Sequence, residues 1–165
     1  MIRPRIIPES TSLDKSLEAI SKIILLATWV IVLLSYSGLP SEIPIHFNAR
    51  GEVDGHANRI FILIIPMISS ILFVGLTILN RYPHKFNYPV KVDQQNALKL
   101  YTHASRMIRI LNVAIGALFL NSAIGCILIA RGIMERLPVW LFPVELFLLF
   151  LIIAIYLIRI IKSAR

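Results

Sequence analysis

The sequence is 165 residues long; 57% of the residues are hydrophobic and only 16% are charged. Soluble domains contain about half apolar and a quarter charged residues, so this composition and a mean hydropathy of +0.77 exclude an ordinary soluble domain. The net charge of +8 would suit a nucleic-acid partner, but the positions of the charges argue against one. The single cysteine, Cys126, excludes an intramolecular disulfide and a cysteine-based metal cluster.

Three stretches without Asp, Glu, Lys or Arg are long enough to cross a bilayer as helices, which takes about 20 residues. They are Ile23 to Ser41, Ile60 to Asn80 and Ile110 to Ala130. A fourth apolar stretch, Leu137 to Ile158, is interrupted only by Glu145. Barrel strands would instead alternate between polar and apolar residues, so these continuous runs indicate helices.

The sequence therefore predicts an all-α membrane protein, with a single integral membrane domain over residues 1–165 and the lipid bilayer as its solvent. Its four transmembrane helices are expected at about 20–39, 60–80, 94–130 and 138–161, with 110–130 as the spanning part of the third. The third helix starts early because the stretch from Asp93 to Arg109 contains no Gly or Pro. This polar extension is a candidate contact for a cytoplasmic regulator.

Lys and Arg are distributed unevenly among the segments that flank these helices. Thirteen of the seventeen lie in the N-terminal segment, in the connection between the second and third helices, and in the C-terminal tail. By the positive-inside rule, both termini are expected in the cytoplasm, and the first and third loops outside. The inner side then has a net charge of +9 and the outer side a net charge of zero. The basic excess is a topology signal, so we predict no nucleic-acid partner.

The first loop, residues 39–59, is longer than most connections between adjacent helices. Pro44 restricts Ile43 to extended geometry, whereas Asn48 to Gly51 and Asp54-Gly55 are turn-like. We therefore expect an ordered outer loop, in which a short extended piece lies on the helix ends and is followed by tight turns.

This loop also carries a motif with the spacing LPxxIPxHFNxxGxxD. Its residues are Leu39, Pro40, Ile43, Pro44, His46, Phe47, Asn48, Gly51 and Asp54. The motif resembles the signature of the SdpI-like bacterial membrane protein family, a domain of unknown function, and the stretch from Phe86 to Lys91 followed by Asn96 is also similar to members of that family.

The resemblance implies a small multi-pass protein of the bacterial cytoplasmic (inner) membrane. The best-known members of the family protect the cell from a secreted toxic peptide and signal its presence by holding a repressor at the membrane. Those members are longer proteins that have further membrane helices, whereas about four membrane helices are expected in this sequence.

The signature loop supports two functional interpretations and one structural alternative. Glu42, His46, Asp54 and His56 have side chains that can bind metal ions, but their spacing matches no strong ligand motif, so we predict no metal site. Recognition of an extracellular peptide or an envelope component is the favoured interpretation. The candidate residues are Pro40, Pro44, His46, Phe47, Asn48, Gly51 and Asp54. The structural alternative is a lid in which His46 and Asn48 bond the loop backbone and Asp54 caps a turn or the second helix.

Three polar residues inside apolar segments are further candidates: Asn112, Asn121 and Glu145. Ionisable groups are costly in a membrane and therefore often functional. If Pro143 were the first residue of the fourth helix, however, Glu145 would lie in its first turn, where a carboxylate stabilises the helix end. The two asparagines could line a polar path, although Asn121 also belongs to a stripe of small residues typical of helix packing.

No catalytic triad, phosphate-binding glycine loop or paired-carboxylate pattern is recognisable in the sequence. We therefore predict a non-enzymatic protein without a cofactor. The leading hypothesis is immunity or signalling towards a secreted toxic peptide through the outer loop. The alternative is a small permease-like protein or transporter accessory subunit that uses Pro66, Asn121 and Glu145.

Overall fold

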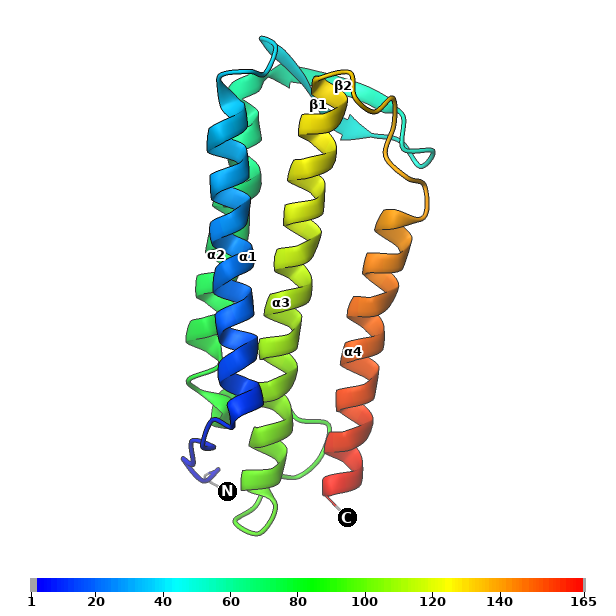
Figure 1. Cartoon of the computed structure of the whole chain (residues 1–165). Coiled ribbons are helices and arrows are strands. Elements are labelled where there is room, and N and C mark those ends of the chain that lie inside the picture. The colour runs from blue at the N-terminus through cyan, green and yellow to red at the C-terminus, as the bar shows by residue number, and fades with distance from the viewer. Residues whose placement is uncertain (1–2, 165) are drawn as a thin grey trace.

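The computed structural model describes residues 3–164 and contains four long helices capped at one end by a β-hairpin (Figure 1). The described N- and C-terminal ends lie together at the opposite end of the bundle (Figure 1). The elements, in chain order, are α1 (Ser12–Tyr36), β1 (Glu42–Phe47), β2 (Val53–Asn58), the 3₁₀ helix η1 (Arg59–Leu63), α2 (Ile64–Leu79), the 3₁₀ helix η2 (Pro83–Lys85), α3 (Ala97–Ala130) and α4 (Leu141–Ser163).

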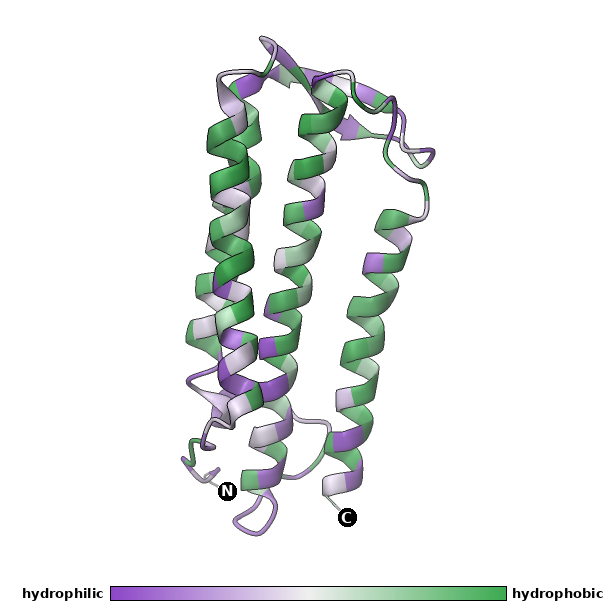
Figure 2. Ribbon diagram, viewed as in Figure 1, coloured by the Kyte–Doolittle hydropathy of each residue, from purple (hydrophilic) through white to green (hydrophobic). Residues whose placement is uncertain are grey.

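All four long helices, with η1 continuing into α2, are long and apolar enough to cross a membrane. Figure 2 shows hydrophobic residues along the middle of each helix and hydrophilic residues gathered near both ends of the bundle. Large apolar side chains such as Leu34, Ile71 and Phe147 are exposed on the outside of the bundle, as expected for helices that face lipid. The chain is therefore a multi-pass membrane protein.

The central helix of the bundle is α3, which packs against α1, α2 and α4. A glycine allows α1 to approach it closely, because a Cβ atom at Gly116 would lie only 3.2 Å from Ile24 Cγ2. Buried residues form two clusters along the bundle. The cluster at the hairpin end contains Val32, Leu39, Ile43, Ile62, Ala123, Cys126 and Ile127, and the cluster at the other end contains Tyr88, Val92, Ala97, Leu100, Tyr101, Ala104 and Ile160.

The connection between α2 and α3 is folded onto the bundle by aromatic side chains. The rings of Tyr88 and Tyr101 lie 5.6 Å apart, and the Tyr88 hydroxyl donates a hydrogen bond to the Pro83 carbonyl at 3.0 Å. Burial raises the pKa of the Tyr88 phenol, so this group remains a neutral donor. The extended part of the connection therefore has a defined position against α3.

Helix α1 begins at Ser12, ahead of the expected start near residue 20, and ends at Tyr36. Its start is set by a capping box: Thr11 Oγ1 accepts a hydrogen bond from the Asp14 backbone N–H, and Asp14 Oδ2 accepts one from the Thr11 backbone N–H. Asp14 also accepts a 2.9 Å hydrogen bond from Arg106 Nε. The polar segment that begins at Ser12 is thus part of α1, because Arg106 on α3 pairs with Asp14 in its first turn.

The chain is mostly helical, as expected, but the first loop contains an antiparallel hairpin in addition to the four helices. Ile43, only 1% exposed, packs on the helix ends, as expected for the extended piece. Asp54 and Gly55 were expected in a turn, but they lie within β2, opposite β1. Asp, Asn and Gly disfavour strands, so the sequence VDGHAN gave no strand signal, and pairing with β1 overrides that preference.

The second apolar stretch is divided between η1 and α2, and Pro66 is the third residue of α2. A proline has no N–H to donate, which costs little within the first turn of a helix. The change from 3₁₀ to α geometry therefore takes place just before Pro66.

Candidate functional site

A cavity of about 540 Å³ lies under the hairpin and is called the hairpin pocket below. It is lined by β1, the hairpin turn, α3, the loop between α3 and α4, and the start of α4. The lining residues are Ile45, His46, Phe47, Asn48, Ala49, Gly51, Asn121, Ser122, Leu137, Pro138, Val139, Leu141, Phe142, Pro143 and Glu145. Its volume is within the range of ligand sites, and its lining is mostly apolar with a few polar groups. The pocket brings together four of the seven candidate residues of the first loop and two of the three candidate polar residues of the helices.

The hairpin turn is shaped by Asn48. The Asn48 Oδ1 atom accepts backbone hydrogen bonds from Arg50 at 2.8 Å and Glu52 at 3.1 Å, while its Nδ2 donates to Glu52 Oε2 at 2.9 Å. These bonds make an Asx-type turn, in which a side chain replaces backbone partners. Asn48 therefore has a structural role in the pocket wall.

His46 and Asp54 bond each other across the hairpin, with 2.5 Å between His46 Nδ1 and Asp54 Oδ1. The His46 side chain is 72% exposed, so this pair lies at the rim of the pocket. The expected roles of His46 as a backbone donor and Asp54 as a cap are replaced by this side-chain pair. Asn58 caps η1 instead, because its Oδ1 accepts the Ile60 backbone N–H.

Gly51 joins the hairpin to the loop before α4. Its φ angle is +75°, its carbonyl accepts a 2.9 Å hydrogen bond from the Leu137 backbone N–H, and an added Cβ would collide with the Leu137 carbonyl oxygen. Both the backbone conformation and the close approach require a glycine. The signature glycine thus closes one wall of the pocket.

The polar floor of the pocket is formed by Asn121 and Glu145. Asn121 Nδ2 on α3 donates a 2.7 Å hydrogen bond to Glu145 Oε1 on α4. The interpretation of Glu145 as a first-turn carboxylate is wrong, because α4 begins at Leu141 and Glu145 is therefore its fifth residue. Its nearest polar contact is a neutral amide from the neighbouring helix.

Two arginines at this end of the bundle contact groups other than Glu145. Arg59 donates to the Leu39 carbonyl and stacks over the Tyr36 ring, and Arg131 donates to the Ser35 carbonyl. Among residues 3–164, no Lys, Arg or His side chain forms an ion pair with Glu145.

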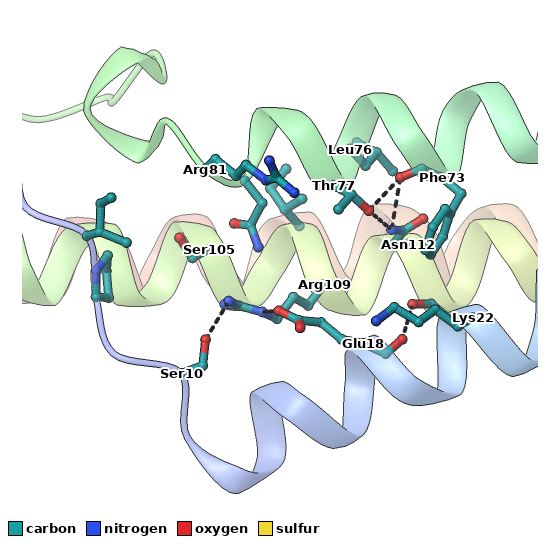
Figure 3. Close-up of a pocket in the computed structure, with 15 residues that line it drawn as sticks. Ser10, Glu18, Lys22, Phe73, Leu76, Thr77, Arg81, Ser105, Arg109 and Asn112 are labelled. Carbon is teal, nitrogen blue, oxygen red and sulfur yellow. Dashed lines mark hydrogen bonds and ion pairs between the residues drawn. The ribbon is translucent and has the colours of Figure 1, made fainter.

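Four of the candidate residues lie outside the pocket lining: Asp54, which pairs with His46, and Pro40, Pro44 and Asn112. Pro44 is a buried residue of β1, and its carbonyl accepts a hydrogen bond from Cys126 Sγ on α3. Pro40 is exposed just before β1. Asn112 lines a different cavity, in which it donates to Thr77 Oγ1 at 3.4 Å (Figure 3). The eight residues between Asn112 and Asn121 are apolar, so the two amides do not form one polar path.

Sequence reasoning missed the part of the pocket that comes from the loop before α4, including Leu137, Leu141 and Phe142. A Pro-containing loop followed by a carboxylate in an apolar helix was the available signal, but it did not indicate contact with the first loop. Within the described residues 3–164, no group of three or more His, Cys, Asp or Glu side chains is arranged to hold a metal ion.

Comparison with known proteins places part of this region in a recognised domain. Residues 23–69 match the model of a domain of unknown function (DUF1648), which here covers most of α1, the hairpin and the start of α2. An uncharacterized protein from Archaeoglobus fulgidus is 36% identical over 87 residues, which cover 48% of this chain and 48% of that relative. The alignment thus spans about half of each protein. No solved structure matches the chain. The DUF1648 segment supplies the hairpin wall of the pocket, whereas α3 and α4, which supply its floor, lie beyond the matched residues.

Proposed function

We propose that this is a non-enzymatic membrane protein whose hairpin pocket binds an apolar segment carrying a positive charge, presented by an extracellular peptide or an envelope component. The observation that carries the proposal is the Glu145 carboxylate, which lies in a mostly apolar pocket and is hydrogen-bonded there by a neutral amide. The biological role that follows is protection against such a peptide or sensing of it.

A carboxylate in apolar surroundings is costly unless it is paired with a cation or satisfied by several hydrogen bonds. Asn121 supplies one hydrogen bond, and neither Lys nor Arg is among the residues that line the pocket. A bound lysine or arginine side chain would compensate the charge, while apolar residues next to it would contact Phe47, Leu141 and Phe142. An amphipathic cationic peptide has both features.

The direction in which the pocket opens follows from the charge distribution. Thirteen of the seventeen Lys and Arg residues belong to the segments at the end where the chain termini lie, so the positive-inside rule favours a cytoplasmic location for that end. In this proposal, the hairpin is on the outer face of the cytoplasmic membrane. The resemblance of the hairpin to the SdpI-like signature supports the same orientation and an immunity role.

A permease-like role is less well supported. Transport of a polar solute needs a polar route through the bundle, and the apolar stretch of α3 between Asn112 and Asn121 offers none on that helix.

The proposal is tested by peptide binding to the full-length protein in phosphatidylcholine nanodiscs. The probes are a short synthetic peptide of alternating Leu and Lys and the same peptide with Glu in place of each Lys. We expect the wild type to prefer the Lys peptide and Glu145→Gln to weaken its affinity by about tenfold or more, because the substitution removes one partner of a desolvated charge pair.

Glu135→Gln is the matched control. Glu135 is an exposed carboxylate in the loop just before α4, and it does not line the pocket. The proposal would be contradicted if Glu145→Gln and Glu135→Gln bound the Lys peptide with equal affinity. It would also be contradicted if nanodiscs containing the wild type bound this peptide no better than empty nanodiscs.

A further inference from the structure

A second cavity, of about 300 Å³, lies at the end of the bundle opposite the hairpin (Figure 3). It is enclosed by the N-terminal segment, α1, the end of α2 and α3. We call it the basic pocket, because its lining includes Lys22, Arg81 and Arg109 but only one carboxylate, Glu18. These four side chains have a net charge of +2, so the pocket favours an anion.

One of the three cations is fixed by the protein and two are available to a ligand. Arg109 Nε donates to Glu18 Oε1 at 2.7 Å, and its guanidinium also donates to Ser10 Oγ at 3.1 Å. Lys22 and Arg81 are exposed, and neither forms an ion pair with any described residue. Figure 3 shows that the three cationic side chains come from α1, the end of α2 and α3.

The position of these cations along the bundle indicates the kind of anion. Lys22 directly precedes the charge-free stretch that starts at Ile23, Arg81 directly follows the stretch that ends at Asn80, and Arg109 directly precedes the one that starts at Ile110. All three therefore lie where the hydrocarbon layer meets the lipid headgroups. This is the level of the lipid phosphates.

The rest of the pocket lining combines apolar and hydroxyl-bearing groups. Phe73, Leu76 and Ile108 form its apolar part, and Ser105 and Thr77 add hydroxyl groups. The side-chain Oδ1 atom of Asn80, which also lines the pocket, is buried and has no hydrogen-bond partner among the described residues. A buried acceptor without a donor is costly, and a ligand hydroxyl would satisfy it.

We propose that the basic pocket binds the phosphate group of an anionic membrane lipid with a hydroxyl-bearing headgroup, such as phosphatidylglycerol. The phosphate lies between Lys22 and Arg81 and the headgroup hydroxyl donates to Asn80, while the acyl chains extend along the lipid-facing helices. A cavity of about 300 Å³ holds a headgroup but not a whole lipid. The same phosphoglycerol chemistry could come from a soluble glycerol phosphate, and the experiment separates the two sources.

The test is native mass spectrometry of the full-length protein in detergent, titrated with phosphatidylglycerol, phosphatidylcholine or glycerol 3-phosphate. We expect preferential retention of phosphatidylglycerol. Lys22→Gln and Arg81→Gln should each weaken this affinity about fivefold, the equivalent of about 1 kcal/mol per interfacial cation, and the double variant should lose the preference for the anionic lipid. Arg81→Lys should keep most of the affinity.

Lys99→Gln is the matched control, because Lys99 is an exposed cation of the same end that does not line the pocket. The proposal is overturned by equal retention of phosphatidylcholine, by an equal loss in Lys99→Gln, or by unchanged affinity in the double variant. Displacement of the lipid by an equimolar amount of glycerol 3-phosphate would assign the pocket to a soluble phosphate and overturn the lipid assignment. The peptide binding proposed for the hairpin pocket is independent of all these outcomes.

Discussion

Each end of the bundle contains a cluster of buried apolar side chains, but the further contacts that join the elements differ between the two ends. At the end with the termini, α1 and α3 are joined by ion pairs, in which Arg106 contacts Asp14 and Arg109 contacts Glu18. At the hairpin end, the joints are steric and backbone-mediated: Gly51 fits against Leu137, and Ile43 is buried on the helix ends. Removal of a charge is therefore expected to destabilise the end with the termini, whereas a larger side chain at Gly51 is expected to destabilise the hairpin end.

The largest expected effect tests the ion-paired end. Asp14 is only 3% exposed, and its carboxylate accepts hydrogen bonds from Arg106 and from the start of α1. Asp14→Ala leaves a partly buried arginine without its partner and removes a helix cap, so we expect the free energy of unfolding to fall by about 3 kcal/mol. The measurement is SDS-induced unfolding in mixed micelles. Glu9→Gln, a change at an exposed carboxylate of the same segment, should have almost no effect, and equal losses would refute the importance of this ion pair.

The next effect tests the steric end. Gly51→Ala places a side chain against the Leu137 carbonyl and in a strained backbone conformation, so we expect a loss of about 2 kcal/mol and weaker peptide binding. Gly132→Ala is a strict control, because Gly132 has a φ angle of +70° but no atom within 4 Å of its added Cβ. It should lose about 1 kcal/mol from the backbone conformation alone and keep its peptide affinity. Identical behaviour of the two variants would show that the contact with Leu137 is unimportant.

A smaller effect concerns the bond between α3 and α4. Interhelical hydrogen bonds in membranes contribute about 1 kcal/mol. A double-mutant cycle of Asn121→Ala and Glu145→Ala, measured by the same unfolding assay, should therefore give a coupling energy of about 1 kcal/mol. Additive effects of the two substitutions would mean that the side chains do not interact.

The smallest effect is expected at the pocket rim. His46 and Asp54 are both substantially exposed, and exposed pairs contribute about 0.5 kcal/mol. His46→Ala should thus barely change the free energy of unfolding. A loss as large as that of Gly51→Ala would show that the His46–Asp54 pair holds the hairpin in place. The hairpin end would then also depend on a charged pair, contrary to the difference between the two ends described above.

The membrane helices were predictable because a bilayer demands long stretches with few or no charges, and each of the four candidate spans contains most of one such stretch. The strand β2 was not predictable from VDGHAN, since its polar and glycine residues form a strand only beside β1. The link between Asn121 and Glu145 was also hidden, because it depends on how α3 and α4 pack across a long sequence separation. Gly51 was singled out by its motif, but the reason for a glycine there, the Leu137 carbonyl, comes from a loop far along the chain.

The most direct test of the central claim is binding of the Lys-containing peptide to cell-derived vesicles of known orientation. Right-side-out and inverted vesicles, each carrying the wild type or Glu145→Gln, are exposed to peptide that cannot cross the membrane. If the hairpin pocket opens outward and Glu145 binds the cation, as proposed, we expect binding above background only to right-side-out vesicles with the wild-type protein. Equal binding to inverted vesicles, or undiminished binding by Glu145→Gln, would contradict the proposal.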